Sequence, residues 1–218
     1  MNRNLNDFAI WLRSLPLRCP WVALVVLVPS VLTFFLVERD VHDTSNLLYF
    51  YIPDLFAAPW RAIPNLTITP LINVSIGQIV VLFLLVGGFG SIIECRLGAR
   101  IAIGLYWATA AAAAIFAGLV WHALHPLFTD SAMFQRPLER VYSGGSAAAF
   151  GMLGGYAALS RRPWPYVAIF VTWESGYWIV KESFIPFFHF AGFFSGLGLM
   201  RWYLGRRAPR SRSEPQTT

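Results

Sequence analysis

The chain has 218 residues, of which 56% are hydrophobic, 16% aromatic and 13% charged. Because a soluble domain carries about 25% charged residues, this composition excludes a disordered tail, a nucleic-acid-binding module and an ordinary cytosolic enzyme. The net charge is +6, and a mean hydropathy of +0.55 makes lipid the expected main solvent.

Long stretches without charge predict membrane spans, because about 20 apolar residues cross a hydrocarbon core. Five such stretches are uncharged, and a sixth is interrupted only by Glu174. The six predicted spans cover residues 19–37, 73–93, 101–121, 143–160, 163–180 and 184–202. We expect residues 1–18 to form a cytoplasmic or interfacial N-terminus, 19–205 a six-helix membrane domain, and 206–218 a disordered basic cytoplasmic tail.

The basic residues predict the orientation of these spans. With the N-terminus inside, twelve Lys and Arg residues fall in cytoplasmic segments and five in outer segments, as the positive-inside rule requires. The sequence therefore predicts an all-α integral membrane protein with both termini cytoplasmic, most simply in a bacterial inner membrane. Cys19 and Cys95 would then lie at cytoplasmic span ends, where thiols stay reduced, so no disulfide is expected.

A serine stands at the outer end of the fourth predicted span, which begins SGGSAAAFGMLGG at residue 143. Small residues of this kind usually serve close helix packing. Ser146, however, follows two glycines at a helix start, where backbone N–H groups have no partner inside the helix. A hydroxyl beside such amides, at the positive end of a helix, can act as a nucleophile next to an oxyanion hole.

A histidine stands at the outer end of the sixth predicted span, in the run FHFAGFFSGL. His189 is followed by Gly192 and Gly196, a pair that lets helices approach closely. We expect this helix to contact the one that starts at Ser146, with a hydrogen bond between hydroxyl and imidazole. A serine needs such a base to be nucleophilic near neutral pH. No carboxylate is expected to orient His189, so the pair would be a dyad.

These runs resemble motifs of the rhomboid intramembrane serine proteases, over residues 60–201. GGSAAAFGMLGG resembles the rhomboid GxSxxxxGxxG run, which implies Ser146 as nucleophile and Phe150 as the ring that flanks the histidine. HFAGFFSGL is similar to the HxxGxxxGL run of the last helix, which implies His189 as base. The resemblance implies a six-transmembrane-helix rhomboid-type bundle that works without a cofactor or metal.

Two further motifs extend the resemblance and imply structural roles. GGFGSIIECRLG, over residues 87–98, resembles the signature that closes the second rhomboid helix, with Glu94 and Gly98 in it. Trp60 and Arg61 resemble the Trp-Arg pair of the first outer loop.

The chain departs from the family pattern where the second helix supports the oxyanion. Two histidines and an asparagine are usual there, whereas this chain has Asn73, Gln78 and Leu82. The two amides can still donate hydrogen bonds, so we expect Asn73 and Gln78 to assist Gly145 and the Ser146 N–H. Leu82 cannot donate, and loss of one oxyanion donor typically costs about 10²–10³ in rate.

Glu174 and two other histidines need their own interpretation. A carboxylate inside a span costs about 2.5–3.5 kcal/mol on insertion scales, so Glu174 should face protein or a wet cavity. It is either bonded to a neighbour such as Trp173 or Ser175, or a gate residue beside the fifth helix, where rhomboids are thought to admit substrate. His122 and His125 lack a third ligand nearby, and no metal site is expected.

Three functions stay open. The first is an intramembrane serine endopeptidase that cleaves the transmembrane segments of client proteins. The second is a catalytically inactive rhomboid-like protein that binds such segments. The third is a small transporter or channel, although the repeated halves typical of transporters are not visible. In the first two, the partners are single membrane-spanning segments within the lipid bilayer, with no nucleic acid and no metal.

Overall fold

A computed structural model of the chain describes residues 19–37, 40–45 and 47–207. Within this part the chain is helical, with one isolated antiparallel bridge between Phe50 and Tyr142 and no β-strand. The prediction of an all-α chain is thereby confirmed for the described residues. The expected N-terminal segment 1–18 lies outside them, as does the expected tail 206–218 apart from its first two residues, which end the last helix.

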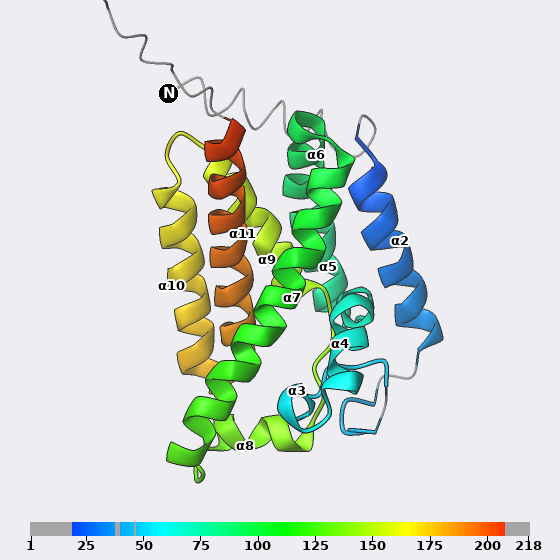
Figure 1. The fold of residues 1–218 in the computed structure, drawn as a ribbon, viewed down its shortest axis with the longest axis vertical. Helices are drawn as coiled ribbons and strands as arrows, with labels where there is room; N and C mark the ends of the chain where they lie inside the picture. Colours follow the sequence, from blue (N-terminus) through cyan, green and yellow to red (C-terminus); the bar gives the residue numbers. More distant parts are fainter. Residues whose placement is uncertain (1–18, 38–39, 46, 208–218) are drawn as a thin grey trace, which may run out of the picture.

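The long helices run side by side along the long axis of the molecule (Figure 1). They are α2 (Trp21–Leu36), α7 (Ala99–Leu124), α9 (Ser146–Leu159), α10 (Trp164–Lys181), α11 (Ile185–Arg207), and the continuous segment of α5 (Ile76–Leu84), the π-helical turn η2 (Leu85–Gly90) and α6 (Ser91–Leu97). Each lies on one of the stretches that the sequence predicts as a span.

Short helices connect the long ones: α3 (Asp54–Ala57), α4 (Pro59–Ile68), η1 (Thr69–Leu71), η3 (His125–Leu127) and α8 (Ala132–Glu139). Figure 1 shows α3 and α8 at the end of the bundle opposite the start of α2 and the end of α11.

Within the described residues, two helical segments are long and apolar enough to cross a membrane, Ile76–Leu97 with 22 residues and Ala99–Leu127 with 29. The outer faces of other helices are also apolar. Exposed large hydrophobic side chains include Leu24, Val28, Leu32 and Phe35 on α2, and Ile169, Trp173, Ile179 and Val180 on α10. An apolar outer face suits a lipid environment, and these features favour a membrane protein. The count of six crossings and the orientation stay predictions.

Helices α9 and α11 pack backbone against backbone. Gly192 faces the carbonyl oxygen of Ala147, and Gly196 faces that of Gly151, so closely that a Cβ on either glycine would overlap with the oxygen. Each step of four residues along one helix matches a step of four along the other, so the two helices run parallel. Small residues permit this approach, as membrane helix pairs commonly show.

Glu94 fixes the start of α2 against the end of α6. Its two carboxylate oxygens accept hydrogen bonds from the backbone N–H groups of Trp21, at 3.1 Å, and Val22, at 2.8 Å. These N–H groups have no partner inside their helix, and a carboxylate also complements the positive helix end. The structural role implied for Glu94 is therefore specific: it caps a neighbouring helix.

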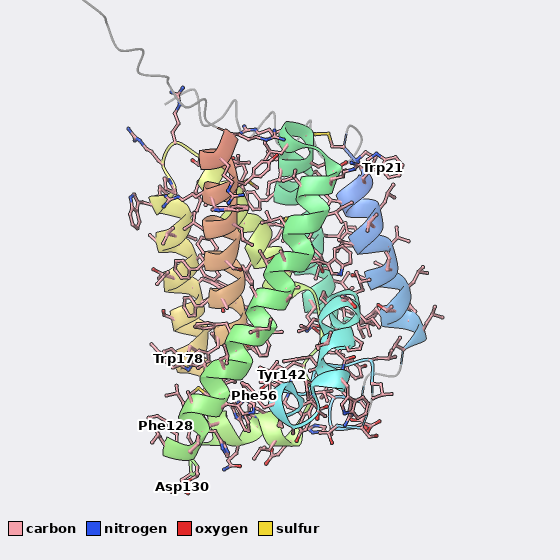
Figure 2. The ribbon with its side chains drawn as sticks, in the orientation of Figure 1. Trp21, Phe56, Phe128, Asp130, Tyr142 and Trp178 are labelled. Atoms are coloured by element: carbon pink, nitrogen blue, oxygen red, sulfur yellow. A yellow bond between two sulfur atoms is a disulfide. The ribbon has the colours of Figure 1, made fainter. Side chains whose placement is uncertain are left out.

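The same junction contains a disulfide bond between Cys19 and Cys95, drawn in Figure 2 at the end of the bundle where Trp21 is labelled. The prediction that both cysteines are reduced is wrong in this structure. Their Cα atoms lie 5.5 Å apart, within the range that a disulfide spans. The cause is the Glu94 cap, because it holds the residues just before α2 next to residue 95, which is 76 positions away in the chain.

Replacing Gly196 by alanine should lower the free energy of unfolding by about 1–3 kcal/mol, the usual effect of overpacking a close contact. Gly198→Ala is the matched control, because it lies on the same helix and a Cβ there meets no atom within 4 Å. Alanine favours a helix over glycine, so the control should be neutral or slightly stabilising. Thermal unfolding in detergent compares the two, and equal midpoints would contradict the backbone contact.

The disulfide predicts that the denatured, unreduced protein reacts with no maleimide, and that reduction exposes two thiols. Because removal of a native disulfide typically costs about 2–5 kcal/mol, reductant or Cys95→Ser should lower the unfolding midpoint. Intact mass after alkylation reads out the first expectation. Two maleimide adducts on unreduced protein would instead support the reduced cysteines that the sequence predicts.

Candidate active site

Backbone hydrogen bonds to Phe50 and Thr69 hold the segment that precedes α9. Tyr142, labelled in Figure 2, exchanges two N–H to carbonyl bonds with Phe50, at 2.8 and 3.0 Å. The Gly144 N–H then donates to the carbonyl oxygen of Thr69 at 3.2 Å. Gly144 has a φ of +100°, which favours glycine, and a Cβ there would lie 2.7 Å from Nε2 of Gln78. The chain thus reaches the start of α9 in a fixed, crowded turn.

The two side chains that the sequence pairs do meet. Ser146 is the first residue of α9, and its Oγ lies 3.1 Å from Nε2 of His189 on α11. The ring of Phe150, one turn further along α9, lies 4.6 Å from the imidazole ring between centroids. With only 12% of the His189 side chain exposed, the ring has little freedom to turn away from the serine.

The other imidazole nitrogen has a partner as well. Nδ1 of His189 lies 2.9 Å from Oε2 of Glu174, whose side chain is 2% exposed. The sequence prediction that no carboxylate orients His189 is therefore wrong. Within the described part of the chain, the side chain of Glu174 bonds to His189 and has no hydrogen bond to Trp173 or Ser175, the neighbours considered from the sequence. Its role as a gate stays a prediction.

The cause is the register of the α10–α11 hairpin. Glu182 ends α10 in the left-handed conformation, with φ of 45°, and α11 begins three residues later. Glu174 stands eight residues before Glu182 and His189 seven after it, so the two are nearly equidistant from the turn. In a helical hairpin such positions lie at the same height. The pairing of Glu174 with His189 could therefore be predicted from the sequence if the position of the turn at Glu182 were known.

Asn73 supports the turn of Gly144 and Gly145 that precedes Ser146. Its side chain is fully buried, its Oδ1 accepts from the Gly145 N–H at 3.4 Å, and its Nδ2 donates to the carbonyl oxygen of Leu71 at 3.4 Å. Gly145 has no room for a side chain, since a Cβ there would overlap with the hydroxyl of Tyr106. Asn73 and Gly145 therefore support the geometry of the turn, and Asn73 does not line the cavity beside Ser146.

Gln78 both caps helix α5 and donates to the backbone shortly before Ser146. It forms a capping box with Ser75 at the start of α5, and its Oε1 also accepts from the Val74 N–H at 2.8 Å. Its Nε2 donates to the carbonyl oxygen of Ser143 at 3.1 Å, and an amide nitrogen carries a second hydrogen. The second hydrogen of Gln78 Nε2 and the Ser146 N–H, which has no partner inside α9, are donors on residues that line the same cavity.

A partly open cavity lies beside Ser146. Ser146, His189 and Gln78 line it together with apolar side chains such as Phe188. Among the described lining residues, Arg140 is the one that carries a permanent charge. A concave, mostly apolar site with a few convergent polar groups is the usual form of a ligand site.

The remaining motif residues lie outside the cavity. Arg61 connects α4 to α3 and to the segment before it. Its Nε lies 3.4 Å from Oδ2 of Asp54, and its guanidinium donates to the carbonyl oxygen of Thr44 at 3.1 Å. Burial raises the pKa of Asp54, although Arg61 acts against the rise. Trp60 is 72% exposed. Gly98, with φ of +95°, forms the turn between α6 and α7.

The histidines of α7 and η3 have structural neighbours. His122 Nδ1 lies 2.8 Å from the carbonyl oxygen of Gly118, and the His125 ring stacks on Trp121. Within the described part of the chain, no cluster of three or more potential metal ligands is found.

The chain was also compared with protein-family models, with curated proteins and with solved structures, and none of the three comparisons finds a match.

Proposed function

We propose that the chain is an intramembrane serine endopeptidase of the rhomboid type, with Ser146 as nucleophile and His189 as base. The observation that carries this proposal is the 3.1 Å contact between Ser146 Oγ and His189 Nε2, at a helix start that lines a cavity. A serine is a weak nucleophile unless a base adjoins it. The order of the motifs along the chain and the apolar outer surface add support.

In the proposed reaction, Ser146 Oγ forms a bond to the carbonyl carbon of a peptide while its proton moves to Nε2 of His189. Negative charge develops on the carbonyl oxygen, where the Ser146 N–H and Gln78 Nε2 donate hydrogen bonds. His189 then gives the proton to the leaving amide nitrogen, and an acyl-enzyme remains. Water, deprotonated by the same histidine, releases the acyl group and restores the serine.

The proposed substrates are single transmembrane segments of client proteins. The helix surfaces beside the cavity are apolar, so a partner that reaches the serine from lipid would be apolar too. A membrane helix protects its peptide bonds by internal hydrogen bonding, so the client must unwind locally before Ser146 can attack.

The proposed location is a bacterial inner membrane, crossed six times with both termini cytoplasmic. The start of α2 and the end of α11 lie at the same end of the bundle (Figure 1), which supports an even number of crossings. The basic residues favour the cytoplasm for that end. The Cys19–Cys95 bond weighs against this orientation, because disulfides persist mainly in oxidising compartments.

A second function, binding of client helices without cleavage, is favoured by one feature of the site. Leu82, at a position where rhomboids carry a polar residue, is fully buried in the core and lies close to Gly145. Asn73 does not line the cavity beside Ser146, and one hydrogen of its side-chain amide is donated to the carbonyl oxygen of Leu71. Fewer donors then face the oxyanion than the family pattern implies.

Covalent labelling by a fluorophosphonate tests the proposed function. The purified wild type should be labelled at Ser146, while Ser146→Ala and His189→Ala should not, because each removes one half of the activated pair. Ser195→Ala is the matched control: Ser195 lies on α11, donates to the carbonyl oxygen of Gly192, and should not affect labelling. A folded wild type that takes no label would favour the inactive, client-binding function.

Gln78→Glu separates the two roles of Gln78. Glutamate also completes a capping box but loses the Nε2 hydrogen bond to the carbonyl oxygen of Ser143, so the unfolding midpoint should fall less than in Gln78→Ala. A carboxylate cannot donate to the oxyanion and repels it, so the labelling rate should fall by about 10²–10³. Gln78→Ala, which removes cap and donor together, should lose both stability and rate. Wild-type labelling by Gln78→Glu would exclude Gln78 as an oxyanion donor.

A further inference from the structure

We propose that Glu174 is a positioning residue for the reaction, so that the site is a Ser146–His189–Glu174 triad. This inference rests on the proposed function. The carboxylate holds the imidazole in the tautomer that carries its proton on Nδ1, and thereby leaves Nε2 free to accept the proton of Ser146.

The tautomer follows from the two contacts of the ring. An ionised carboxylate can only accept a hydrogen bond, so at 2.9 Å from Oε2 the Nδ1 atom must be the donor. A neutral imidazole has one donor and one acceptor. Nε2 is then the acceptor, and the hydroxyl of Ser146, 3.1 Å away, must donate to it. Without Glu174 the ring could hold its proton on Nε2, and Ser146 would have no base.

Packing does not explain a carboxylate at this position. Of the 18 residues of α10, Phe170 and Glu174 are the two that are buried. An apolar side chain would attach the helix equally well and would avoid the cost of removing a charge from water. Ionisable residues inside membrane segments are rare and usually functional. The benefit of Glu174 therefore has to come from its contact with His189.

The neighbouring rings reinforce this assignment. Phe150 lies against the imidazole, and Phe170 lies 5.2 Å from Phe150 between ring centroids. These rings limit how far the imidazole can tilt, but they are apolar and cannot select its tautomer. The selection falls to Glu174.

The test uses full-length protein in detergent, with Glu174→Gln, Glu174→Asp and the packing control Phe170→Leu. The first quantity measured is the rate of fluorophosphonate labelling. The second is the tautomer of His189, from nitrogen NMR of ¹⁵N-histidine-labelled protein. The His189 signals are assigned by their loss in His189→Ala. A merely structural role for Glu174 would not change the tautomer of a folded protein.

We expect the wild type to show the proton on Nδ1. Glu174→Gln keeps the shape but loses the charge, so labelling should fall by about 10²–10⁴ and the Nε2-protonated tautomer should appear. Glu174→Asp keeps the charge on a shorter side chain and should recover part of the rate. Phe170→Leu should keep the tautomer, because it loosens α10 without touching the ring.

Two results would overturn the inference. One is a Glu174→Gln protein that labels at the wild-type rate with an unchanged tautomer, which leaves the serine peptidase proposal intact. The other is a wild-type spectrum with the proton on Nε2, which needs no variant to fold. If the wild type takes no label, the proposed function fails, and the tautomer in wild type and Glu174→Gln alone decides whether Glu174 positions the ring.

Discussion

Contact between the backbones of α9 and α11 sets the distance between the side chains of Ser146 and His189. Gly192 lies on the carbonyl oxygen of Ala147, the residue directly after Ser146, and His189 stands one turn before Gly192 on the same helix. A side chain between the two backbones would move the helices apart and lengthen the 3.1 Å contact. The absence of a side chain at Gly192 therefore permits this contact, and the proposed serine chemistry depends on helix packing as much as on the serine.

Helix α10 adds the third group while remaining largely outside the core. Its outer face is apolar and exposed, and its inner face offers Phe170 and Glu174. A carboxylate with 2% exposure is stable only when it is paired. Nδ1 of His189 is the partner of the Glu174 carboxylate, and the carboxylate is the partner of Nδ1. The pair joins α10 to α11, and the same contact holds the ring whose other nitrogen lies 3.1 Å from Ser146 Oγ.

Much of this arrangement could be predicted from the sequence, because the relevant signals are local. Uncharged stretches of suitable length mark the long helices, and small residues next to Ser146 and His189 indicate which helices approach each other. Glu174 was missed as the partner of His189 because the register of α10 and α11 depends on Glu182, a residue that does not usually mark a left-handed helix end. The disulfide was missed because residues 76 positions apart meet only through the Glu94 cap. The role of Asn73 depends on which of its side-chain atoms faces Gly145, and that is decided by the loop around it.

The most direct test of the account is cleavage in reconstituted vesicles. Wild-type protein would be incorporated together with a set of labelled single-span membrane proteins, beside vesicles that contain Ser146→Ala, and the products would be identified by mass spectrometry. The account predicts at least one client cut within or beside its membrane segment by the wild type, with no cut by the variant. Identical products from both proteins, or no product from a wild type that is folded and binds the clients, would contradict it.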